Sequence, residues 1–97
     1  MRVAQHPDAN AELIEAARYY ESSVPTFGKQ FLDAIDDAIA LISRSPERCA
    51  VVEHDIRRYI LRRFPFSIYF RVEYDLIRIL AFKHHSRHPD YWRDRLS

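Results

Sequence analysis

Apolar residues recur at helical spacing in the first half of the chain and at strand spacing in the second half. Asp8 is a good N-cap for a helix over residues 8–22, and Pro25 is placed to open a second one. Pro46 ends the second stretch, because the residue before a proline disfavours helical dihedrals. The apolar positions that repeat are Leu13, Ala16, Ala17 and Tyr20, followed by Phe27, Phe31, Ala34, Ile35, Ala38, Ile39 and Ile42. The pattern predicts two antiparallel helices joined by "SSVPTFG".

Three later segments are rich in β-branched and aromatic residues and read as strands. They are "IRRYILRR" at 56–63, "FSIYFRVE" at 66–73 and "LIRILAFK" at 76–83. The middle segment alternates, which puts apolar residues on one face and Ser67, Tyr69, Arg71 and Glu73 on the other. Two residues, Tyr74 and Asp75, connect the last two segments and predict a hairpin. Residues 2–6 could form a first short strand that Pro7 ends.

The order of these elements predicts an α+β fold, β-α-α-β-β-β. A helical hairpin would pack on one face of a small antiparallel sheet, and the other face would carry arginines and tyrosines. The 97 residues correspond to a single domain, 1–97.

Composition places the chain among globular proteins. The apolar content is 47%, and the apolar runs are too short to cross a membrane. The N-terminus has no apolar signal-peptide core, so we expect no membrane partner. Cys49 is the only cysteine, which fits the reducing cytoplasm.

The net charge of +1 hides a division between two halves. Residues 1–56 hold five Lys/Arg and ten Asp/Glu, whereas residues 57–97 hold ten Lys/Arg and four Asp/Glu. The halves therefore carry −5 and +6. This asymmetry suggests that the C-terminal half faces an anionic macromolecule, either nucleic acid or an acidic protein segment. Attraction between the two halves would explain part of the pattern.

The stretch "LAFKHHSRHPDYWRD" concentrates the candidate chemistry. Its histidines lack the spacing of a metal site, so we expect neither metal nor cofactor. His85 suits acid–base chemistry, although a solvated loop histidine is an equal alternative. Trp92 more often pins a terminal segment onto a core than stacks on a base, and Tyr91 is the better site candidate because of its hydroxyl.

Taken in order, three segments resemble the RelE/ParE superfamily of toxins from type II toxin–antitoxin modules. They are "AELIEAARYYE", "RRYILRRFPFSIYFRVE" and "IRILAFKHHSRHPDYWRDR", and the resemblance covers nearly the whole chain. It implies a cognate antitoxin whose acidic, amphipathic segment would bind the basic sheet face and any apolar groove by the helices. A hetero-oligomer with that antitoxin is then expected.

The RelE-like branch consists of ribosome-dependent messenger-RNA endonucleases. Membership would imply a catalytic set at Arg58, His85, Arg87 and Tyr91. The set is partial, because a further basic position of that branch falls on Ile60 and its third-strand arginine falls on Ser67, which carries no charge.

The ParE-like branch inhibits DNA gyrase without nuclease chemistry, and the incomplete catalytic set favours it. The residues expected to contact the target or the antitoxin are Arg62, Arg63, Tyr69, Arg71, Arg78, His84 and Trp92. A third alternative is a degenerate member that only binds its antitoxin and takes part in operon regulation.

Overall fold

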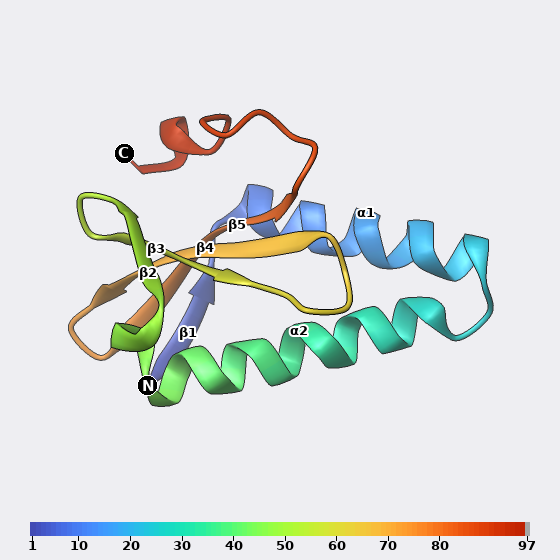
Figure 1. Cartoon of the computed structure of the whole chain (residues 1–97), viewed down its shortest axis with the longest axis horizontal. Coiled ribbons are helices and arrows are strands. Elements are labelled where there is room, and N and C mark those ends of the chain that lie inside the picture. Colours follow the sequence, from blue (N-terminus) through green and yellow to red (C-terminus); the bar gives the residue numbers. More distant parts are fainter. Residues whose placement is uncertain (97) are drawn as a thin grey trace.

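A helical hairpin covers one face of a five-stranded sheet, and the C-terminal segment lies on the opposite side (Figure 1). The computed structural model describes residues 1–96. The elements run β1 (Arg2–Gln5), α1 (Pro7–Ser23), α2 (Phe27–Arg44), β2 (Ala50–Glu53), β3 (Ile56–Ile60), β4 (Phe66–Glu73) and β5 (Leu76–His84). Short 3₁₀ turns occur at Pro46–Arg48 and Arg93–Leu96.

The strands lie in the order β1-β5-β4-β3-β2. The pairing of β1 with β5 is parallel, and the other pairs are antiparallel. This architecture confirms the predicted α+β fold and adds the edge strand β2, which the sequence pattern did not predict. No helix within residues 1–96 has the length and apolarity needed to cross a bilayer.

Strand β3 is shorter than predicted because the chain leaves the sheet at Leu61. Leu61 and Phe64 are 6% and 3% exposed and pack into the core beneath the helices. The Leu61 N–H donates to the Phe66 carbonyl at 3.0 Å, which closes the connection between β3 and β4. The five residues between Ile60 and Phe66 therefore form a turn anchored by its apolar side chains.

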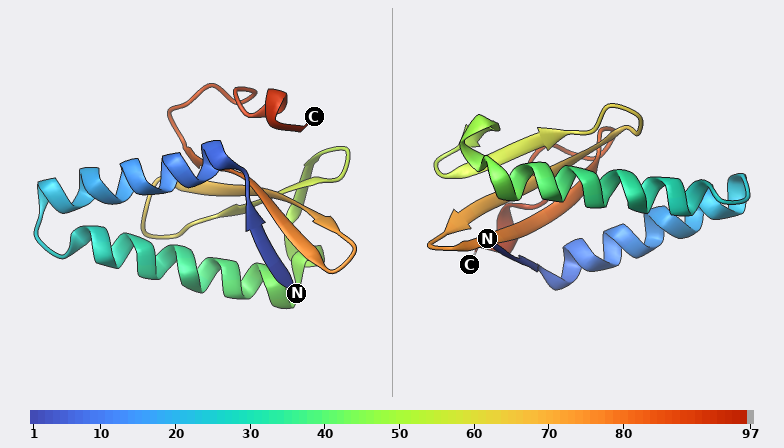
Figure 2. Two further views of the ribbon diagram at one scale, coloured as in Figure 1. Left: turned by 180° about the vertical axis from the view of Figure 1, so that it is seen from behind. Right: turned by 90° about the horizontal axis from the view of Figure 1, so that it is seen from below.

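The connection between the helices also differs from the prediction, because α2 begins after Pro25 and not at it. Thr26 has φ 70°, in the left-handed region. The Glu21 carboxylate, on α1, accepts N–H bonds from Thr26 and Gly28 at 3.0 Å each. A side chain of one helix thus caps the other, and the tip of the hairpin projects beyond the sheet (Figure 2).

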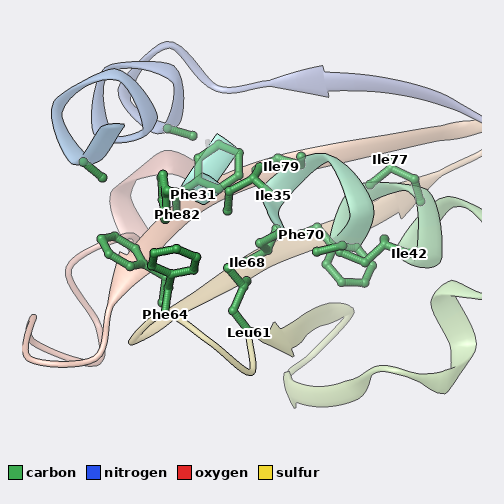
Figure 3. Close-up of a cluster of buried hydrophobic side chains, with 14 of the residues drawn as sticks. Phe31, Ile35, Ile42, Leu61, Phe64, Ile68, Phe70, Ile77, Ile79 and Phe82 are labelled. Atoms are coloured by element: carbon green, nitrogen blue, oxygen red, sulfur yellow. The ribbon is translucent and has the colours of Figure 1, made fainter. Parts of the chain in front are cut away.

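The main core lies between the helices and the sheet (Figure 3). Phe31, Ile35 and Ile42 of α2 meet the helix-facing side chains of β4 and β5 there. Tyr20 of α1 contacts the rings of Phe31 and Phe64 with centroids 5.2 and 5.1 Å apart. Burial of each such ring contributes about 1.5–3 kcal/mol, so this core holds the sheet that carries the site.

We call the sheet surface opposite the helices the outer face. A β-bulge in β5 changes which residues reach it, because Tyr69 pairs with Ala81 whereas Phe70 pairs with Ile79. Leu80 is the extra residue. Leu80 and Ala81 both join a second buried cluster on the outer face, and Phe82 returns to the helix side.

Candidate functional site

The predicted bare outer face is in fact divided into three parts. At one end, Glu73 forms ion pairs with arginines. The C-terminal segment covers the centre, and the opposite end carries basic side chains. The covering segment could not be foreseen from strand alternation, because alternation describes the sheet alone.

At the paired end, Glu73 lies between two predicted contact residues. Its carboxylate accepts from Arg71 Nε at 2.9 Å and from Arg78 Nε at 3.0 Å. The bond from Arg78, together with that from Arg71, holds the pKa of Glu73 below its ordinary value against the effect of burial. Arg71 also reaches the Leu96 carbonyl at 3.5 Å. These two arginines share one carboxylate, which cancels one of their two positive charges.

At the centre, Tyr69 and Trp92 pack on each other with ring centroids 5.3 Å apart. They are 7% and 2% exposed, together with Ile56, Leu80 and Ala81 in the same cluster. The Trp92 indole N–H donates to the Pro89 carbonyl at 2.7 Å. Both aromatic residues thus pin the C-terminal segment to the sheet and present no ring to a partner.

Tyr91 is held by a buried ion pair between α1 and the C-terminal segment. Arg95 Nη1 and Nη2 donate to the Glu12 carboxylate at 2.8 and 3.2 Å, and the Tyr91 hydroxyl donates to the same group. Burial and the Glu12 hydrogen bond raise the pKa of Tyr91 far above its ordinary value. Arg87 lies over the Tyr91 ring, with its guanidinium carbon 4.2 Å from the centroid. Tyr91 is therefore occupied as a structural residue.

The basic end combines residues of β3, β4 and β5. Cross-strand pairing puts Arg58 beside Tyr69, and Lys83 beside Ser67, all on the outer face. The His85 ring Nε2 lies 3.0 Å from Ser67 Oγ, and the His85 N–H donates to the Pro65 carbonyl at 2.9 Å. Two predicted residues, Arg58 and His85, therefore lie at the same end of the sheet, and the Arg87 N–H donates to the His84 carbonyl at 3.0 Å in the loop that follows β5.

Lys83 is the most unusual member of this end. It is only 6% exposed, and its ammonium donates to the His84 carbonyl at 3.2 Å. Burial, followed by the nearby charges of Arg58 and Arg87, lowers the pKa of Lys83. Among residues 1–96, no ion pair includes Lys83, Arg58 or Arg87.

Three further predicted contact residues lie at the same end, two in the loop after β3 and one, His84, at the end of β5. Arg62 is exposed, whereas Arg63 donates to the Gln30 side chain at 3.1 Å and covers the Phe64 ring. His84 packs edge-on against Phe66, and its Nδ1 accepts the Ser86 N–H at 3.0 Å. The histidines are therefore engaged separately, and no group of three His, Cys, Asp or Glu side chains within residues 1–96 could hold a metal ion.

A groove of about 820 Å³ lies between the C-terminal end of α2 and the strands β2 and β3. Its apolar lining includes Leu41 and Ile60, which are 44% and 52% exposed. Its basic lining comprises Arg44, Arg48, Arg58 and Arg62. Pairing with β2 stops at Arg58, so the following residues of β3 face the groove without a neighbouring strand.

Sequence reasoning missed Lys83, Ser67 and Glu12 as parts of the site. Lys83 follows the bulge, and its outward position depends on an extra residue that alternation does not reveal. Glu12 looks like one of several surface acids of α1, because its partner Arg95 is 83 positions away. The net charge division between the halves was the only available signal for that pairing.

The family model for the ParE toxin of the type II toxin–antitoxin system parDE matches residues 3–89. Among solved structures, a chain of the chromosomal ParDE toxin–antitoxin system from P. aeruginosa is similar, with a TM-score of 0.62 and 24% sequence identity. The alignment covers 87% of this chain and 95% of that chain. None of the curated protein sequences compared with the chain matches it.

Proposed function

Since the chain belongs to the ParE toxin family of type II toxin–antitoxin systems, we propose that it inhibits DNA gyrase and that an acidic antitoxin neutralises it. The observation that favours gyrase over the ribosome is the engagement of Tyr91 by Glu12. A ribonuclease of the RelE type would need that hydroxyl, but here it is part-buried and donates to Glu12, and its pKa is raised. A contact surface, by contrast, needs only accessible basic side chains.

The experiment compares two reactions of the purified chain. We expect it to block supercoiling by gyrase, to leave ribosome-bound messenger RNA uncut, and to lose its effect when the antitoxin is added. The variants His85→Ala and Tyr91→Phe should likewise leave the messenger RNA uncut. Codon-positioned cleavage that disappears in His85→Ala would instead establish the ribonuclease alternative. Harmless expression without antitoxin would identify a degenerate member.

The groove beside α2 supports the proposal of an acidic, partly apolar antitoxin segment. Leu41 and Ile60 offer exposed apolar surface, and the four arginines of the rim complement carboxylates. The free edge of β3 beyond Arg58 offers backbone groups to an extended chain. Such a segment would gain apolar burial, strand pairing and charge complementarity at one place.

Two leucines of α2 provide a matched test of this groove. Leu41 lines it, whereas Leu32 is exposed to a similar extent, 38%, outside it. We expect Leu41→Glu to weaken antitoxin binding by about tenfold or more, because it removes apolar contact and repels an acidic segment. Leu32→Glu should bind like the unchanged protein in the same calorimetric titration. Equal effects of the two variants would exclude the groove.

A further inference from the structure

The side chains at the basic end of the outer face are not neutralised by carboxylates within residues 1–96. Arg71 and Arg78 share the Glu73 carboxylate and Arg95 pairs with Glu12, whereas Lys83, Arg58 and Arg87 have no ion pair within residues 1–96. Arg58 Nε is buried and has no hydrogen-bond partner. A buried cation without a counter-charge costs free energy, so a domain of this size retains one where a ligand anion completes the site.

The arrangement of donors indicates the shape of that anion. Lys83 pairs with Ser67, Arg58 pairs with Tyr69 two residues away on β4, and His85 Nε2 lies 3.0 Å from Ser67 Oγ, so these four donors come together at one end of the outer face. Arg87, in the loop after β5, adds a positive charge near Lys83. A planar carboxylate has two oxygens and is served by one bidentate arginine. Donors that approach from several directions suit a tetrahedral oxyanion with more oxygens.

We propose that Lys83, Arg58 and Arg87 form a binding site for a backbone phosphate of nucleic acid. Ser67 and His85 supply hydrogen-bonding groups beside it. The inference rests on the proposed function only for the identity of the nucleic acid, which would be the DNA on which gyrase acts. Binding needs no acid or base, so Tyr91 can remain engaged with Glu12.

The test measures the affinity of the purified full chain for fluorescently labelled nucleic acid by anisotropy. We expect Lys83→Gln and Arg58→Gln each to weaken binding about tenfold and to reduce the dependence of log K on log salt by about one. Lys83→Arg should retain most of the affinity. Lys29→Gln is the control, since it removes the same charge from an exposed site on α2.

Two ligands distinguish the source of the phosphate. A short DNA duplex should bind through Lys83, and single-stranded RNA of equal length is the comparison. Stronger, Lys83-dependent binding of RNA would support the site but assign it to RNA. Equal losses in Lys83→Gln and Lys29→Gln, or no loss in either, would overturn the proposal, because binding would then follow net charge alone.

A stability measurement separates a binding role from a structural one. Lys83→Met should raise the thermal midpoint of the free protein, because it removes a poorly solvated charge, while it abolishes nucleic-acid binding. A lower midpoint together with unchanged binding would mean that Lys83 only supports the sheet. Gyrase inhibition is assayed separately. Unchanged nucleic-acid binding by Lys83→Gln in a chain that inhibits gyrase overturns this inference alone, and Lys83-dependent binding by a chain that does not inhibit gyrase overturns the proposed function alone.

Discussion

At the scale of the residue, the buried charges of Arg95 and Lys83 differ in whether a carboxylate neutralises them. Arg95 and Glu12 are 9% and 15% exposed at their side chains, and each satisfies the other. Glu12 also accepts the Phe82 N–H at 3.2 Å, so one carboxylate connects α1, β5 and the C-terminal segment. Lys83 is as deeply buried but has only a carbonyl partner. The first arrangement stabilises the fold, and the second leaves a charge available.

The Glu12 carboxylate should therefore be a main support of the C-terminal segment. We expect Glu12→Gln to lower the free energy of unfolding by about 2–3 kcal/mol, because it leaves the Arg95 guanidinium buried without a counter-charge. Urea unfolding followed by circular dichroism measures this. Glu15→Gln, at an exposed position of the same helix, is the control and should change stability by about 0.5 kcal/mol or less. If Glu12→Gln also changed stability by only about 0.5 kcal/mol, the ion pair between Glu12 and Arg95 would not be stabilising.

At the scale of the element, the helical hairpin depends on the only glycine of the chain. Gly28 lies at the start of α2 where the two helices approach closely. A Cβ at this position would lie 2.6 Å from the Ala17 carbonyl oxygen and 2.9 Å from the Glu21 Cβ. The nearest atom belongs to the backbone of α1, so it cannot move without shifting the helix.

Gly28→Ala should accordingly destabilise the protein, although alanine is the better helix former. We expect a loss of about 1–3 kcal/mol from the forced separation of the helices, larger than the gain of up to ~1 kcal/mol in helix propensity. Thermal unfolding of the variant measures the balance. Lys29→Ala, one residue along and exposed, should change stability much less, because its pair with Asp33 is screened by solvent. An increase in stability for Gly28→Ala would mean that the hairpin has room to open.

The helices and strands could be predicted from the sequence where a regular apolar pattern continues along the whole element. Strand β4 has the predicted bounds, 66–73, because its alternation is uninterrupted. Strand β3 ends early because Leu61 and Phe64 turn into the core, and a short apolar run does not show which way it will bend. The candidate site was less predictable, since the position of Lys83 depends on a bulge and the engagement of Tyr91 depends on a residue 79 positions away.

At the scale of the whole molecule, the division of charge between the halves has two outcomes. Part of it is neutralised between them, because Arg95 pairs with Glu12 and Arg93 pairs with Glu53. The remainder collects at the end of the sheet where β3 and β5 finish. The acidic first half therefore acts as an internal counter-charge for the C-terminal segment only. The sequence prediction of a basic surface is correct for one end of the outer face.

The layered arrangement also predicts how stability is distributed. Strands β4 and β5 are buried on the helix side and, at their centres, on the outer face as well. We expect their amides to exchange only by global unfolding, at about 5 kcal/mol or more. Amides of the edge strand β2, where Val51 is 53% exposed, should exchange with little protection. Native-state hydrogen exchange measures this, and protection of β2 equal to that of β4 would contradict this distribution of stability.

The extra residue in β5 has a consequence for comparing this chain with its relatives. A relative whose last strand pairs without that irregularity has one residue fewer between the turn and the end of the strand. Aligned without a gap at position 80, its outward residue would be matched to Phe82, and its core residue to Lys83. Functional assignments transferred by such an alignment would exchange interior and surface positions over the end of β5, residues 81–84.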